Sequence, residues 1–148
     1  MQRRTRTVVY ATLMALFVAC SAGAQIYRYY KPGTVWTVTA IRVAAGMDAS
    51  YLQYLDGQFK KDQDALVKAG FMKSYRILRT TDDDYASWNL LILREYASLA
   101  SLEANEEKAD ALSRQTLGDD QAQMKGYEDR SKFREVVWTK MAREFMLK

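Results

Sequence analysis

The chain has 148 residues, of which 49% are hydrophobic and 27% charged, with one proline, one cysteine and no histidine. This composition excludes wholesale disorder, and the length fits one domain with a core of its own. The lack of histidine excludes Ser-His-Asp catalysis, histidine-ligated zinc or iron, and haem held by a proximal histidine.

Residues 1–24 have the pattern of an export signal. Three arginines precede an uncharged apolar run at residues 8–19, and Ala-Gly-Ala at residues 22–24 forms a cleavage site. The run is short for a membrane span, so we expect cleavage near Ala24 and a periplasmic or secreted protein. A retained membrane anchor is one alternative. A lipid anchor at Cys20 is another, although Phe17 stands where lipoproteins usually carry leucine.

Signal cleavage changes the charge and the redox chemistry of the chain. The full chain has 22 basic and 18 acidic residues, and the signal takes three arginines and no acid, which leaves 19 against 18. A nearly neutral mature chain of 124 residues gives no electrostatic reason to expect nucleic-acid binding. Cys20 is also removed, so the mature chain must be stabilised by core packing without a disulfide.

Residues 25–34 are predicted to form an N-terminal arm ahead of the domain at residues 35–148. The segment is rich in tyrosine, and Pro32-Gly33 predicts a turn before the first strand. The arm either lies on its own domain or packs on a second subunit.

Four β-strands are predicted, at residues 35–43, 72–80, 88–96 and 134–147. The strand at 88–96 holds the most continuous apolar run outside the N-terminus. Its leucines and isoleucine point to both faces, because successive strand residues point in opposite directions. This strand therefore needs cover on both sides, as does the strand at 35–43. The strand at 72–80 is the most polar, which suits a sheet edge.

Two helices are predicted between these strands. The first begins with Asp48 as N-cap and ends at Gly70. Gly57 within it indicates either close packing or a break. The second is capped by Ser98 and runs to about Gln115. The apolar stripe predicted for the first helix contains Leu52, Leu55, Phe59, Leu66 and Val67.

Two polar stretches are predicted to be loops. Residues 118–133 are polar and aperiodic, and connections of that length are often lids or binding loops. Three aspartates at residues 82–84 lack the spacing of a calcium-binding loop, so we interpret them as a solvated connection.

The element order, β-α-β-β-α-β, predicts an α+β domain with a ferredoxin-like split βαβ topology. Right-handed crossovers give an antiparallel four-stranded sheet in the order 4-1-3-2. Two helices cover only one face of such a sheet. The other face keeps large apolar residues, and such a patch usually meets a partner. We therefore predict a homodimer in which two sheets face each other.

This pattern resembles the dimeric α+β barrel superfamily, which includes antibiotic-biosynthesis monooxygenases, NIPSNAP-type proteins and stress-responsive barrel proteins. The resemblance covers residues 35–147 and rests on element order and on Val-Trp-Thr-Val-Thr-Ala-Ile-Arg-Val-Ala-Ala-Gly at residues 35–46 leading into a helix. The chain is also similar to small exported bacterial proteins of unknown function that end in a strand like Ala-Arg-Glu-Phe-Met-Leu-Lys. Haem-handling members are poor models, because this chain lacks histidine.

The residues predict binding rather than chemistry. The mature chain has no thiol, phosphate-binding loop or dinucleotide fingerprint. We accordingly predict no catalytic residue, no metal site and no cofactor, and a non-catalytic binding or structural role. The alternative, implied by the resemblance, is a cofactor-independent monooxygenase- or isomerase-like enzyme on a small aromatic substrate, with a buried carboxylate as base. The residues predicted to line an apolar or aromatic ligand cavity are Trp36, Tyr75, Trp88, Arg94 and Trp138.

Overall fold

The structure, a computed structural model, describes residues 29–81 and 87–148. The predicted signal at residues 1–24 and the aspartates at 82–84 lie outside these ranges, so the expectations for them stand as predictions. Within the described ranges, no helix combines the length and the apolar character needed to cross a membrane.

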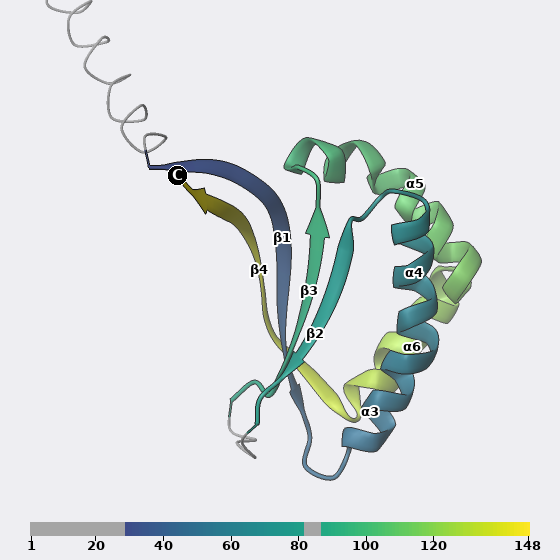
Figure 1. The fold of residues 1–148 in the computed structure, drawn as a ribbon. Coiled ribbons are helices and arrows are strands. Elements are labelled where there is room, and N and C mark those ends of the chain that lie inside the picture. The colour runs from purple at the N-terminus through teal and green to yellow at the C-terminus, as the bar shows by residue number, and fades with distance from the viewer. Residues whose placement is uncertain (1–28, 82–86) are drawn as a thin grey trace, which may run out of the picture. The chain divides into compact units, whose positions relative to one another are not determined.

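Four antiparallel strands form one sheet: β1 (Tyr30–Val43), β2 (Ser74–Arg79), β3 (Leu90–Tyr96) and β4 (Arg134–Leu147). Their order is β2-β3-β1-β4, which is the predicted order 4-1-3-2 read from the other edge. β3 pairs with β1 on one side and with β2 on the other. All helices of the described residues lie on one side of this sheet (Figure 1). The predicted topology is confirmed.

The bounds of β4 match the prediction, but β1 begins five residues earlier than predicted. Pro32 and Gly33 are therefore part of a strand and do not form a turn. The pairing of β1 with β3 starts only at Val35, so the chain before it is paired on one side at most. A proline is tolerated there because its missing N–H is not needed for the ladder.

Chain contacts group residues 29–33 with 145–148, apart from a larger unit at residues 34–144. Within the smaller group, the ring of Tyr30 stacks on that of Phe145 with centroids 3.9 Å apart. The backbone N–H of Lys148 donates to the carbonyl of Tyr29 at 3.2 Å.

The first predicted helix is interrupted by a π-turn. It comprises α3 (Asp48–Tyr54), the π-helical η1 (Leu55–Phe59) and α4 (Lys60–Lys68). Tyr51, Leu55 and Phe59 are buried and lie four residues apart. In a regular α-helix four residues overshoot one turn by about 40°, and the wider π-turn reduces this drift.

The structure corrects the predicted roles of Leu52 and Asp48 in this helix and decides between the two interpretations of Gly57. Leu52, predicted on the buried stripe, is 49% exposed, and Tyr51 is buried in its place. Gly57 lies within η1, and a Cβ added there would meet nothing within 4 Å, so the glycine marks the break and not close packing. Asp48 is the first helical residue rather than the cap, and its carboxylate pairs with Arg79 Nη1 at 2.6 Å.

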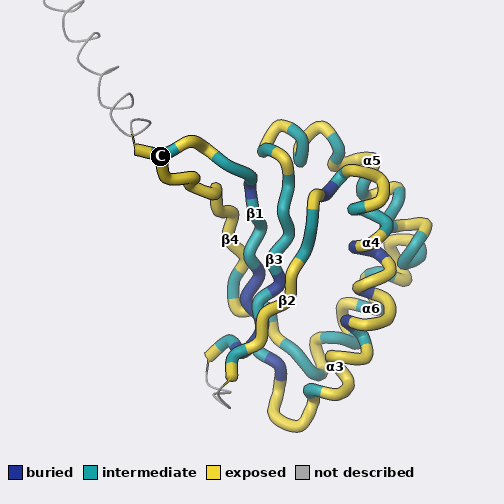
Figure 2. The backbone as a smooth tube through the Cα atoms, in the orientation of Figure 1, coloured by how far each residue is buried: buried dark blue, intermediate teal, exposed yellow. Residues whose placement is uncertain are grey.

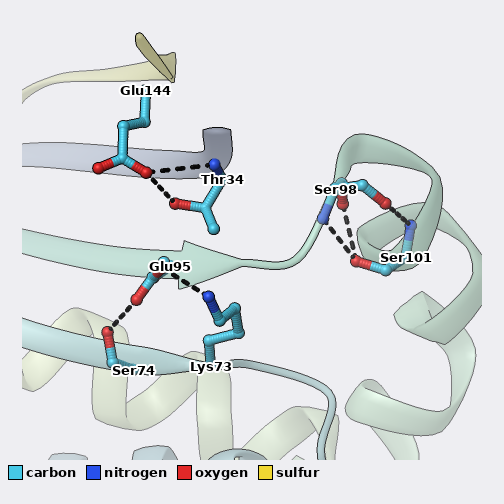
Figure 3. Close-up of polar contacts among 7 residues, drawn as sticks. All are labelled: Thr34, Lys73, Ser74, Glu95, Ser98, Ser101 and Glu144. Carbon is cyan, nitrogen blue, oxygen red and sulfur yellow. Dashed lines mark hydrogen bonds and ion pairs between the residues drawn. The ribbon is translucent and has the colours of Figure 1, made fainter. Parts of the chain in front are cut away.

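α5 (Leu99–Leu117) begins at the predicted cap. Ser98 Oγ accepts from the N–H of Ser101 at 3.0 Å, and Ser101 Oγ accepts from the N–H of Ser98 at 3.0 Å (Figure 3). These reciprocal bonds satisfy two donors at the helix start. The helix ends at Gly118, whose φ of +97° favours glycine.

The segment predicted as a lid or binding loop, residues 118–133, is largely a helix, α6 (Asp120–Ser131). The Asp119 carboxylate caps it by accepting from the N–H of Ala122 at 2.9 Å. An i,i+4 ion pair between Lys125 and Asp129 supports it at 2.9 Å. No residue of α6 is buried, so its sequence carries no apolar helical period. Helix α5 is the predicted second helix, and α6 is an additional helix where a loop was predicted.

The core lies between the sheet and the α3–η1–α4 helix (Figure 2). We call this side of the sheet the helix face and the opposite side the open face. The buried residues that form the core are Ile41, Val43, Leu90 and Ile92 of the sheet and Tyr51, Leu55 and Phe59 of the helix.

Asn89 ties the sheet together at the start of β3. Its side chain is buried, with Oδ1 accepting from the N–H of Val43 at 2.9 Å and Nδ2 donating to the carbonyl of Val43 at 3.1 Å. Its backbone N–H donates to the carbonyl of Ile41, and its carbonyl accepts from the N–H of Thr80, each at 3.0 Å. One residue therefore joins β1, β3 and the chain after β2.

We expect Asn89→Ala to lower the free energy of unfolding by at least about 2 kcal/mol, because it leaves both backbone groups of Val43 unpaired in the interior. Urea unfolding followed by circular dichroism measures this. Asn105→Ala is the matched control, since Asn105 only donates to a carbonyl within its own helix. Equal effects of the two variants would contradict the role given to Asn89.

Candidate functional site

The open face carries an apolar surface that no described helix covers (Figure 1). Strand alternation identifies the residues of this face, because they alternate along each strand with the core residues of the helix face. The pairs Val38–Leu93, Ala40–Leu91 and Leu78–Leu91 lie on it. The residues that are at least partly exposed on this surface are Trp36 and Val38 of β1, Arg76 and Leu78 of β2, and Leu91 and Leu93 of β3, whereas Ala40 on the same face is fully buried. The Arg76 guanidinium lies 5.8 Å from the centroid of the Trp36 ring.

Four polar residues, one from each strand, lie next to this surface, where Glu95 pairs with Trp36 and with Ser74. Figure 3 shows their contacts together with Lys73, which precedes β2. Ser74 Oγ donates to Glu95 Oε2 at 2.6 Å, and Lys73 Nζ lies 3.1 Å from Glu95 Oε1. The N–H and Oγ1 of Thr34 donate to Glu144 Oε2 at 3.4 and 3.2 Å. The hydrogen bond from Ser74, followed by that from Lys73, outweighs burial and holds the pKa of Glu95 below its usual range.

A second polar network lies on the helix side. Thr116 Oγ1 and Gln63 Nε2 each donate to the buried Asp62 carboxylate at 2.8 Å, and Arg94 Nε donates to Gln63 Oε1 at 2.6 Å. The network connects α4 with α5 and β3. The burial of Asp62 and Gln63 is not evident from the sequence, because polar residues in a helix indicate an exposed face.

The structure separates the residues predicted to line one ligand cavity. Tyr75 and Arg94 are paired neighbours on the helix face, and both contact the Phe59 ring. Trp36 lies on the open face, so these residues do not share one wall. Trp88 is half-buried just before β3. Trp138 lies in β4, with Lys140 Nζ 5.3 Å from the centre of its ring.

A cluster of tyrosines and arginines, missed by the sequence analysis, surrounds Tyr51 on the helix side. The Tyr51 ring lies 5.8 Å from that of Tyr54. Burial raises the pKa of Tyr51 to about 12, against the opposing charges of Arg134, Arg130 and Arg94. Tyr51 is therefore a neutral phenol near neutral pH and a poor base.

A cavity of about 210 Å³ lies between η1 and α6 beside this cluster. It is smaller than the roughly 300–1,000 Å³ of sites for drug-sized molecules, which fits a smaller ligand. Its wall includes Tyr54, Gln58, Gln123, Gly126, Tyr127 and Arg130. This cavity is not evident from the sequence, because one of its walls is the unpredicted helix α6.

No protein-family model and no curated protein matches the sequence. Two solved dimeric ferredoxin-like proteins from an uncultured marine organism are similar in structure, each with 14% identity and a TM-score of 0.50. The fold is ferredoxin-like. The alignments cover 80% of this chain and 90% of the first, and 78% of this chain and 96% of the second. A NIPSNAP family protein with unknown function from Agrobacterium tumefaciens has 12% identity and a TM-score of 0.48, over 78% of this chain and 90% of that chain.

We expect Glu95→Gln to lower the free energy of unfolding by about 1 kcal/mol near neutral pH, since the Glu95 side chain is only 15% exposed and accepts charge-strengthened hydrogen bonds. A lowered folded-state pKa stabilises the fold above the ordinary glutamate pKa, and this gain is lost as the pH falls through the folded-state value. The difference from wild type should therefore shrink below about pH 4.

Urea titrations of both proteins across the acid range measure this difference. Glu107→Gln is the control, because Glu107 is exposed on α5. A difference that stayed constant down to the lowest pH would show that Glu95 contributes through packing and not through its charge.

Proposed function

We propose that the mature chain is an exported homodimeric binding module without chemistry of its own, in which the open faces of two subunits pack together. The observation that carries the proposal is the apolar surface of the open face, on a sheet whose helices all lie on the other side.

The composition of the open face supports a protein partner. Leu78 is 51% exposed, and Leu91 and Leu93 at the middle of the surface are only half-buried. Contiguous apolar surfaces of this kind mark interaction sites in soluble proteins. The four polar residues beside this surface, which include Ser74 and Glu144, supply a polar border, and protein interfaces typically combine an apolar centre with a polar rim.

A second copy of the chain is the partner that fits best. The two marine proteins of similar fold are described as dimeric. A twofold interface places the same surface of both subunits in contact, so an apolar face can cover itself.

The polar groups support binding rather than catalysis. A cofactor-independent enzyme needs a base whose pKa lies near the working pH. Asp62 and Asp64 on the helix side already accept hydrogen bonds from neighbouring side chains. The pKa of Glu95 is lowered, and burial followed by the bond to Asp64 raises that of Tyr75 to about 12. These shifts move both groups away from the range that a base or acid needs.

Leu93→Lys tests the interface. We expect the wild-type mature chain to have twice the chain mass in size-exclusion chromatography with light scattering, and the variant to be a folded monomer, because two buried lysines would face each other without counter-charge. Met124→Lys is the control, since Met124 is 64% exposed on α6. A monomeric wild type, or a Leu93→Lys dimer, would contradict the proposal.

The proposed export is tested separately from the dimer. We expect the protein recovered from a bacterial periplasm or culture medium to begin at Gln25, as read by intact mass. A mass that retains residues 1–24 would contradict cleavage. A mass that starts at Cys20 with added acyl chains would show the lipid anchor instead.

A further inference from the structure

Three half-buried arginines on the helix side have aromatic neighbours in place of carboxylates. Among the described residues, Arg42, Arg79 and Arg114 each form an ion pair with an acid. Arg94, Arg130 and Arg134 have no acidic group of the described chain within 4.0 Å. They come from β3, α6 and β4, and all three charges act on the Tyr51 hydroxyl.

The surroundings of these arginines leave part of their charge unbalanced. The Arg130 guanidinium carbon lies 4.8 Å from the centre of the Tyr54 ring, and that of Arg134 lies 5.1 Å from the Tyr127 ring. The Nε atoms of Arg130 and Arg134 are buried and have no hydrogen-bond partner. Ring faces attract such cations, but a buried N–H donor that has no partner costs free energy.

The cavity of about 210 Å³ between η1 and α6 opens beside one of these groups, because Arg130 is part of its wall. A Cβ at Gly126 would lie 2.9 Å from Arg130 Nη1. Glycine at this position therefore lets Arg130 lie along α6 and over Tyr54. The rest of the wall supplies two phenol rings, from Tyr54 and Tyr127, and two amides, from Gln58 and Gln123.

We propose that this cavity binds a small aromatic carboxylate, with the carboxylate on Arg130 and its ring between Tyr54 and Tyr127. Arginine matches a carboxylate through two parallel N–H donors, which favours this anion over a neutral ligand. Arg134 and Arg94 add positive potential from the sheet. The two glutamine amides can pair with polar substituents on the ring.

The proposal names the ligand class of the binding module, and in this it rests on the proposed function. It does not depend on the dimer, because the cavity lies within one subunit and on the helix side. A light-scattering mass recorded on the same sample separates the two. A dimer that does not bind the ligand would overturn this proposal alone, and a monomer that binds it would overturn the dimer alone.

Calorimetric titration of the mature chain with sodium benzoate tests the site. We expect benzoate to bind. Its neutral analogue benzamide should bind at least about tenfold more weakly, since it lacks the charge that Arg130 pairs with. Inorganic phosphate should also bind more weakly, because it has no ring. Equal affinity for benzoate and benzamide, or equally tight binding of phosphate, would overturn the assignment.

Arg130→Gln should weaken benzoate binding by about tenfold or more, because the neutral amide loses the charge-assisted pair. Lys108→Gln is the matched control, since it removes one positive charge from an exposed position on α5 outside the cavity wall and should leave the affinity unchanged. Gly126→Ala supplies a second variant that keeps the charge and displaces Arg130, and we expect it to weaken binding several-fold. Wild-type affinity in either folded cavity variant would overturn the role of Arg130.

Discussion

The structure depends on one constraint: the inner strands β1 and β3 are apolar on both faces, and the helices cover only one. On the helix face, Ile41 and Ile92 pack against Leu55 and Phe59. On the open face, Val38 pairs with Leu93 in a surface without a helix. Apolar area left in water contributes nothing to stability, which is the physical reason for our proposal that a second copy of the sheet covers the open face.

The helix side is shaped by how the chain covers its half of the sheet. The π-turn at Leu55–Phe59 keeps three large side chains over the strands. The polar residues that then face inward, Asp62 and Gln63, are satisfied by Thr116 and Arg94. α6 adds Arg130 and Tyr127 at the edge of this layer, and the arginine cluster with its cavity results from that addition.

The sequence predicted the strands, their order and the Ser98 cap, because these depend on alternation and on local hydrogen bonding. It failed at α6, since a helix without buried residues has no apolar period, although the Asp119 cap and the Lys125–Asp129 pair were readable. The choice of Leu52 over Tyr51 failed because a π-turn shifts the phase of a helix. The wall of the cavity beside Arg130 comes from α3 and η1 and from the end of α5 and α6, two segments that are far apart in the sequence. The spacing of residues along the chain does not show that these segments come into contact.

A crystal structure of residues 25–148 tests the central claim most directly, because it shows what covers the open face. We expect two copies related by a twofold axis, with Trp36, Leu91 and Leu93 of one subunit buried against the same surface of the other. An open face that remains in solvent, or that is covered by another segment of its own chain, would contradict it.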